Sequence, residues 1–178
     1  MALLLSDQMR TVYVAASHSY RDLLPLGSHP ILDPLWSTET MEIVHDGCEA
    51  TRPEKVARLA TCDLALKTLR VCWENRDGAY NCGKCRKCLS TMVNLHLVGA
   101  LSRCATFARP LDLRAVSRIT PSRSTFALLA ASLDMTERSG DTAVVRALRD
   151  CLTQRYERGI WRLVRGAWRC ARGLIDRA

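Results

Sequence analysis

The segment LRVCWENRDGAYNCGKCRKCLSTMVNLHLVGAL, residues 69–101, carries the strongest structural signal in the 178-residue chain. It contains one cysteine, nine intervening residues and then a CxxCxxC run. Two residues between cysteines allow a tight turn that points both sulfurs at one ion, and zinc prefers four tetrahedral ligands. The pattern therefore predicts one zinc ion, bound by Cys72, Cys82, Cys85 and Cys88.

The residues between these cysteines suit such a site. Gly83 allows the backbone to turn without a side-chain clash. Lys84, Arg86 and Lys87 place positive charge beside a dianionic zinc-thiolate centre and are expected to favour deprotonated sulfurs. Four cysteine ligands leave no open position for water, so the predicted ion is structural rather than catalytic. It would join the preceding loop to the helix that follows.

Other uses of the cysteines remain open at this point. An iron–sulfur cluster is also held by closely spaced cysteines, and four cysteine ligands do not exclude one. A redox-active CxxC pair would leave the other two cysteines unexplained, and a site without metal is the third alternative. The chain has nine cysteines and no secretion signal, which indicates thiols in a reducing compartment. This favours a cytoplasmic, metal-binding protein.

Upstream of the cysteines, the sequence predicts an α/β fold. Residues 11–16, TVYVAA, are β-branched and aromatic, as is typical of a buried strand in a parallel sheet. Residues 17–38 contain three prolines and are expected to form a loop at the carboxyl end of that strand, where open α/β sheets bind ligands. Ser28, His29 and Asp33 are the predicted substrate-binding residues of this loop. The alternative is that they only shape turns.

Local signals predict further elements. Residues 31–36 are expected to be extended, and residues 37–47 to form a helix that starts at hydroxyl and acidic side chains and ends at a glycine. Thr51 and Glu54 have the spacing of a capping box at the start of the next helix. The remaining predicted elements are a short strand or extended segment at 69–73 and helices at 88–101, 111–118 and 122–133.

Two histidines receive no catalytic role from the sequence. His45 is expected to lie at a solvated helix end, and His96 to be a hydrogen-bonded structural histidine within a helix. A serine hydrolase is also poorly supported, because the chain has no GxSxG motif.

The C-terminal segment is strongly basic. From Arg138 onward there are ten arginines and four acidic residues, so this segment supplies most of the net charge of +8. Apolar residues from Val145 to Leu174 recur along one stripe, which predicts a basic amphipathic helix. This tail could pack on the core, bind nucleic acid or phosphate, or lie at a membrane surface, which Trp161 and Trp168 would suit. No apolar run approaches the ~20 residues that a transmembrane helix needs.

Residues 69–101 resemble the C-terminal zinc-binding segment of the 7-cyano-7-deazaguanine synthases, in which a lone cysteine precedes a CxxCxxC run by a similar gap. Residues 33–47, DPLWSTETMEIVHDG, look like that family's stretch in which a Pro-Leu pair is followed by Ser/Thr and an acidic residue. These synthases are PP-loop ATP pyrophosphatases, which adenylate an oxygen and then replace AMP with a nitrogen or sulfur nucleophile. The resemblance covers about residues 12–101. It implies a partial Rossmann-like sheet of the adenine nucleotide alpha hydrolase type, with a zinc-stapled helical C-terminal region.

The chain departs from this family in one respect. The SGGxDS phosphate loop is missing, because no Ser-Gly-Gly occurs in the 178 residues, and the chain therefore has no evident cradle for pyrophosphate. The resemblance thus implies the C-terminal portion of an ATP-dependent ligase that is not catalytic alone. ATP and Mg²⁺ would bind only if an N-terminal partner chain supplied the missing half.

A second function stays open. The chain would then be a noncatalytic zinc-binding module that engages nucleic acid or a protein partner through its arginine-rich tail. A homo-oligomer is also possible. In either case we expect two parts: residues 1–108, a partial α/β domain with the cysteine site, and residues 109–178, a helical extension with the basic tail.

Overall fold

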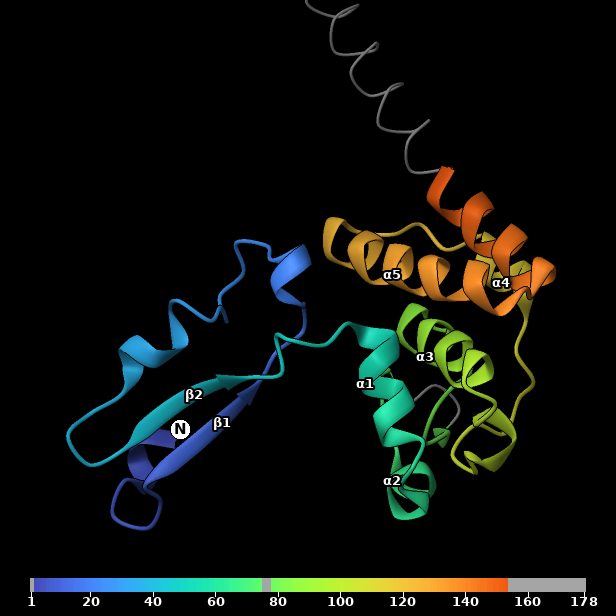
Figure 1. The fold of residues 1–178 in the computed structure, drawn as a ribbon. Coiled ribbons are helices and arrows are strands. Elements are labelled where there is room, and N and C mark those ends of the chain that lie inside the picture. The colour runs from blue at the N-terminus through green and yellow to red at the C-terminus, as the bar shows by residue number, and fades with distance from the viewer. Residues whose placement is uncertain (1, 75–77, 154–178) are drawn as a thin grey trace, which may run out of the picture.

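The computed structural model describes residues 2–74 and 78–153 (Figure 1). Residues 154–178, which hold most of the predicted amphipathic tail, lie outside the described residues. In the part of the chain described, no helix is both long and apolar enough to cross a membrane. The elements, with η for 3-10 helices, are η1 (Ala2–Leu5), β1 (Thr11–Ala15), η2 (Tyr20–Asp22), η3 (Asp33–Trp36), β2 (Glu42–Asp46), α1 (Arg52–Leu59), α2 (Asp63–Thr68), α3 (Arg86–Leu97), η5 (Leu101–Arg103), α4 (Leu113–Ser117), α5 (Arg123–Ser139) and a helix over residues 142–153.

The strands form a small parallel sheet. β1 pairs with β2 in a register that runs from Thr11 opposite Glu42 to Ala15 opposite Asp46. This confirms the strand predicted at residues 11–16 and its parallel pairing, but no residue of β1 is buried as predicted. The fold is therefore a helical assembly with a two-stranded parallel sheet, and the partial Rossmann-like sheet predicted from the sequence is not confirmed.

The two outer edges of this sheet differ. On the outer edge of β2 the Ser37 hydroxyl accepts the Ile43 N–H at 2.9 Å, and just before the strand the Thr38 hydroxyl accepts the Met41 N–H at 3.1 Å. On β1, the ladder uses the backbone groups of the even-numbered residues, so those of the odd-numbered residues point outward. These outward groups have no hydrogen-bond partner in the described part of the chain, and Tyr13 at their centre is 69% exposed. We call this the open edge of β1.

The elements predicted for residues 31–47 are wrong. The predicted helix is instead strand β2, and the predicted extended piece is largely the 3-10 helix η3. The Ser37 hydroxyl, predicted to start a helix, instead binds the edge of β2 at Ile43. Ile43 and Val44 give the strand its β-branched centre.

For residues 69–73, predicted to be a strand or an extended segment, the structure has no strand, because this segment has no neighbouring strand. A single side chain, Asn81, takes the place of one. Its carbonyl oxygen accepts the N–H groups of Val71 and Cys72 at 3.0 and 3.1 Å, and its amide donates to the Leu69 carbonyl at 2.8 Å. Asn81 therefore satisfies the backbone groups that a sheet would have paired.

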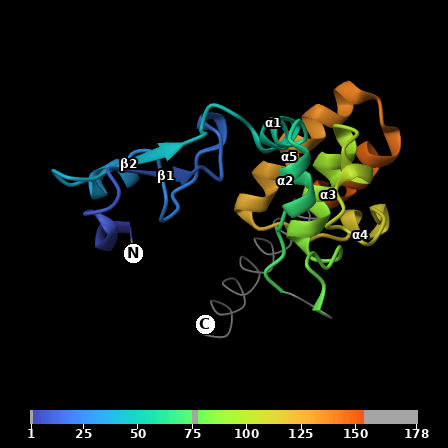
Figure 2. The same cartoon turned by 90° about the horizontal axis from the view of Figure 1, so that it is seen from below.

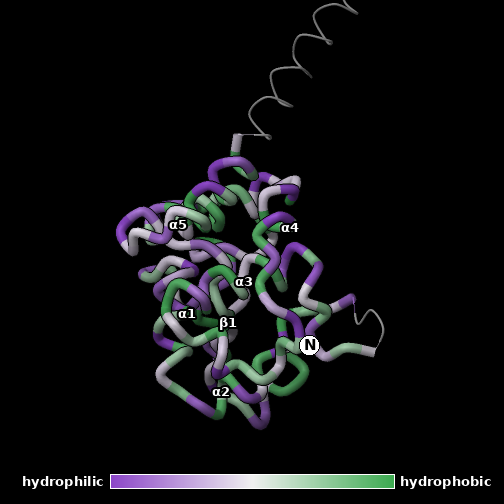
Figure 3. The backbone as a smooth tube through the Cα atoms, turned by 90° about the vertical axis from the view of Figure 1, so that its right-hand side faces the viewer, coloured by the Kyte–Doolittle hydropathy of each residue, from purple (hydrophilic) through white to green (hydrophobic). Residues whose placement is uncertain are grey.

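The helices predicted between residues 51 and 133 are found. Thr51 and Glu54 form the expected capping box, with the Thr51 N–H 2.7 Å from the Glu54 carboxylate. Helix α5 extends beyond its predicted end, and hydrophilic and hydrophobic residues alternate along it (Figure 3). One continuous hydrophobic cluster joins α3, α4, α5 and residues 142–153; its buried members are Leu89, Val93, Val116, Ile119, Leu129, Val144, Ala147, Leu148 and Cys151.

The sheet lies to one side of the helices (Figures 1 and 2). The chain crosses between the two parts at residues 47–51, and the Lys55 ammonium donates a hydrogen bond to the Ala16 carbonyl at 2.9 Å. The three hydrophobic clusters of the described residues contain no residue of the sheet.

Gly140 ends α5 in the left-handed conformation, with φ of +78°, and donates its N–H to the Thr136 carbonyl. We expect Gly140→Ala to lower the free energy of unfolding by roughly 1–2 kcal/mol, because a Cβ is unfavourable at this φ even though no atom lies within 4 Å of its position. Urea denaturation would measure the change. Gly27→Ala is the matched control, since Gly27 has equal space but no left-handed φ. An equal loss in both variants would contradict the assignment.

Candidate metal centre and strand-edge pocket

The four cysteines of the predicted metal site converge in the structure. Cys72 follows α2, Cys82 lies in the turn before α3, Cys85 is the N-cap of α3, and Cys88 lies in its first turn. All four sulfurs lie within 4.8 Å of one another. The chain thus brings together ligands that are 16 residues apart (72 to 88) at the start of one helix.

The sulfur separations match those around a single tetrahedral ion. The Cys82 and Cys88 sulfurs are 3.8 Å apart, and those of Cys72 and Cys85 are 4.0 Å apart. Zinc–sulfur bonds of about 2.3 Å place tetrahedral ligand sulfurs about 3.8 Å from one another. The four cysteines could therefore hold a metal ion such as zinc.

Backbone geometry fixes the sulfurs in place. The N–H of Cys85 donates to the Cys82 sulfur at 3.3 Å, and the N–H of Cys88 donates to the Cys85 sulfur at 3.5 Å. Gly83 has a φ of +66°, and a Cβ there would lie 3.2 Å from the Cβ of Arg109. Glycine therefore suits both the turn and the close approach of Arg109.

Burial dominates the chemistry of these thiols. Cys72, Cys82 and Cys88 are buried, and burial raises the pKa of Cys88 and of Cys85. The expectation that neighbouring cations favour deprotonated sulfurs in a zinc-thiolate centre stays a prediction; the lysine and arginine side chains of the turn are exposed. Metal binding would have to displace protons from these sulfurs, which makes metal affinity dependent on pH.

The predicted substrate-binding residues come together at the carboxyl end of the sheet. The Asp33 carboxylate accepts hydrogen bonds from the Ser28 hydroxyl at 2.7 Å and from the His29 N–H at 3.2 Å. It also lies 2.6 Å from Nδ1 of His45. These hydrogen bonds, that from His45 foremost, lower the pKa of Asp33, and an ionised carboxylate can only accept, so Nδ1 of His45 carries the proton. A substrate-binding role for Ser28, His29 and Asp33 stays a prediction.

His45 is the residue that sequence reasoning placed wrongly. It lies on β2 rather than at a solvated helix end, and its side chain is 5% exposed. The available signal was the alternation of Ile43 and His45, which both point to the sheet face covered by the loop. His96, by contrast, forms the expected hydrogen bond, with its Nε2 2.9 Å from the carboxylate of Asp141.

A small cavity of about 60 Å³ lies beside the Asp33–His45 pair. His18, His29 and His45 line it, together with two serines and several apolar residues. His18 is 6% exposed, and its Nδ1 has no hydrogen-bond partner in the described part of the chain. Burial, followed by the positive charge of Arg52, lowers the pKa of His18 and favours its neutral form. We call this cavity the strand-edge pocket.

The remaining cysteines were predicted to be small core residues. Cys48, Cys104 and Cys151 are buried as expected, whereas Cys62 is exposed. Cys170 lies outside the described residues.

No protein-family model, curated protein or solved structure matches this chain.

Proposed function

We propose that Cys72, Cys82, Cys85 and Cys88 hold one structural zinc ion. The spacing of their sulfurs supports this, because four sulfurs within 4.8 Å suit a single ion. A cluster of several iron atoms needs its ligand sulfurs further apart than one ion does. The ion would fix the segment before it to α3 and, with no ligand position left for water, would supply no chemistry of its own.

We propose further that the chain is the C-terminal portion of a PP-loop synthase-like, ATP-dependent ligase that is not catalytic alone. The observation that carries this proposal is the parallel β1–β2 pair, with the strand-edge pocket at its carboxyl end. In open parallel sheets, ligands bind at this end of the strands. Asp33, Ser28 and His29 would then contact substrate or nucleotide, as the sequence resemblance implies.

The open edge of β1 supports the incompleteness of the site. Parallel strands occur almost only in larger sheets that are covered on both faces, and isolated two-stranded sheets are marginal. β1 contains no charge and no proline that would protect an edge, whereas the Ser37 hydroxyl already binds the Ile43 N–H on the edge of β2. A partner segment that carries the phosphate loop would therefore add at β1.

Within such a site, this chain would hold a proton acceptor. Asp33 fixes His45 with the proton on Nδ1, which leaves the lone pair of Nε2 to accept a proton from a bound group. The buried, neutral His18 would offer a second ring nitrogen in the same pocket.

Calorimetry with ATP and Mg²⁺ tests this function. We expect no ATP binding by the zinc-loaded chain alone, because it has no phosphate loop, and we expect binding once an SGGxDS-containing polypeptide encoded beside this chain is co-expressed with it. ATP binding by the chain alone would contradict its dependence on a partner. If the neighbouring coding DNA contains no SGGxDS segment, or if the joint complex does not bind ATP, the ligase proposal is wrong.

The alternative function is a noncatalytic zinc-binding module that engages nucleic acid or a protein partner. The feature that would distinguish it in the sequence, the arginine-rich tail, falls mainly on residues 154–178, outside the described residues. The alternative predicts that metal-loaded protein binds a polyanion through this tail, whether or not a phosphate-loop partner is present.

A further inference from the structure

Positive charge is concentrated around the cysteine turn. From residue 78 to residue 133 the sequence has eight basic residues and a single acidic one, Asp112, whereas residues 1–50 have two basic and seven acidic residues. All eight basic side chains are exposed. The excess of basic over acidic residues in this segment is larger than the two negative charges that a divalent ion bound by four thiolates would retain. We define the basic face as Lys84, Arg86, Lys87, Arg109 and Arg118.

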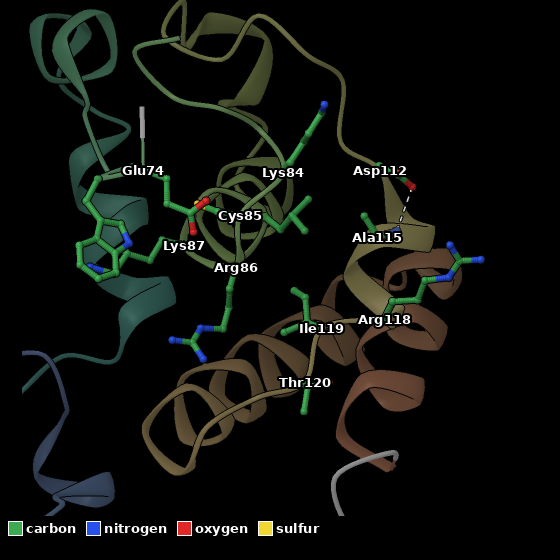
Figure 4. A pocket seen from close by; sticks show the side chains of 12 residues that line it. Glu74, Lys84, Cys85, Arg86, Lys87, Asp112, Ala115, Arg118, Ile119 and Thr120 are labelled. Carbon is green, nitrogen blue, oxygen red and sulfur yellow. Dashed lines mark hydrogen bonds between the residues drawn. The ribbon is translucent and has the colours of Figure 1, made fainter. Parts of the chain in front are cut away.

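Four of the five side chains of the basic face line a cavity of about 510 Å³ (Figure 4). Lys84, Arg86 and Lys87 line it from the turn and the first turn of α3, and Arg118 lines it from the end of α4. Its apolar floor includes Leu89 and Ile119, which belong to the main hydrophobic cluster and keep the walls in place. Arg109, which lies against Gly83, extends the positive charge beyond the cavity.

Two acidic residues also line this cavity. Asp112 is the N-cap of α4, and its carboxylate accepts the Ala115 N–H at 3.0 Å, so it is engaged within its own helix. Glu74 lies on the opposite wall. In the described part of the chain, none of Lys84, Arg86 and Arg118 forms an ion pair, so these cations are available to an anionic ligand.

An aromatic side chain stands at the rim of the same cavity. Trp73 is 77% exposed, and the Lys87 ammonium lies 5.3 Å from the centre of its ring. A largely exposed indole beside several cations is the combination with which proteins bind single-stranded nucleic acid, since bases stack on the ring and phosphates bind the cations. A duplex would hide its base faces from Trp73.

We propose that this cavity binds single-stranded nucleic acid, with a base stacked on Trp73 and the backbone phosphates on Lys84, Arg86 and Arg118. The binding is independent of the ligase function and of the basic tail. It requires only that the cysteine turn is folded.

Fluorescence anisotropy with a labelled 12-nucleotide single strand and the metal-loaded full chain tests this site. We expect the double variant Arg86→Ala/Arg118→Ala to weaken binding at least tenfold. The slope of log affinity against log salt concentration should become shallower by the amount that corresponds to about two phosphate contacts. Trp73→Ala should weaken binding about tenfold, within the range measured for base stacking, and Trp73→Phe should restore most of it.

Controls separate this cavity from other basic surfaces. Arg103→Ala removes an exposed cation that pairs with Asp63 away from the cavity, and it should leave affinity nearly unchanged. A tail variant, Arg162→Ala/Arg165→Ala/Arg169→Ala, should lose less affinity than the cavity variant. Metal content is measured for every variant, and Arg86→Gln/Arg118→Gln replaces any variant that loses its metal.

The outcomes are distinct. If the tail variant abolishes binding while the cavity variants bind normally, the proposal is overturned and the tail is the binding segment. Equal affinity for a 12-base-pair duplex, or binding of mononucleotides as tight as that of the strand, would also overturn it. Because ATP and its partner chain are absent from these assays, failure here leaves the calorimetric test of the ligase unaffected.

Discussion

Cys88→Ser should abolish metal binding and unfold the junction between the cysteine turn and α3. Cys88 is 0% exposed, and its sulfur lies 3.8 Å from that of Cys82. Structural zinc contributes roughly 10–16 kcal/mol of binding free energy in small zinc domains, and that energy is coupled to folding. Metal analysis should fall from one zinc per chain to none, and the thermal unfolding transition should broaden and move to lower temperature.

Two other cysteines provide controls for this variant. Cys62→Ser changes an exposed thiol outside the cluster and should alter neither metal content nor stability. Cys104→Ala changes a buried thiol that donates to the Leu66 carbonyl, so it should cost some stability but retain the metal. Iron with visible absorbance in the wild-type protein would contradict the zinc assignment, as would a full complement of zinc in Cys88→Ser.

Asp33→Ala should produce the second large effect, a loss of about 3 kcal/mol in the free energy of unfolding. Its carboxylate is the common acceptor for Ser28, His29 and His45, and removing it leaves buried donors without a partner. Urea denaturation would measure the loss. Asp134→Ala is the control, because Asp134 pairs with Arg138 on the exposed surface of α5, where ion pairs contribute about 0.5 kcal/mol. Equal losses would show that the Asp33 pair is not a buried anchor.

The same carboxylate sets the response of the protein to acid. Hydrogen bonding holds the pKa of Asp33 below its ordinary value of 3.8, so its contribution to stability is fully present above that pH and is lost as the pH falls through the lowered pKa. We therefore expect the free energy of unfolding to fall steeply below pH 4 in the wild type and less steeply in Asp33→Asn. Denaturation midpoints between pH 2 and pH 6 would show the difference, and parallel pH profiles for the two proteins would contradict it.

The cysteine site was the part of the molecule most readily predicted from sequence. Its ligands are close in the chain, and a CxxC turn constrains the sulfurs locally, so spacing alone predicted that Cys82, Cys85 and Cys88 would converge. The capping box at Thr51 was predicted for the same reason, since both partners lie within one helical turn.

Features that depend on distant partners were missed. Ser37 was predicted to be part of a helix start, yet its hydroxyl accepts the N–H of Ile43, which lies in a strand that the sequence did not predict. The Asn81 side chain accepts backbone hydrogen bonds from Val71 and Cys72 in place of a neighbouring strand, and no local sequence pattern predicts such hydrogen bonds. The contact between Asp33 and His45 spans 12 residues and depends on the position of β2, which is why His45 was assigned to solvent.

The single crossing between the sheet and the helices, at residues 47–51, bears on how the molecule unfolds. The sheet contributes no residue to the three hydrophobic clusters of the described residues, so its opening would leave the helical core and the cysteine cluster intact. Backbone amides of β1 and β2 should therefore exchange with deuterium through a low-energy subglobal opening, while those of α3 and α5 exchange only on global unfolding. We therefore expect two cooperative units, with the losses predicted for the Asp33 variants falling on the transition of the sheet.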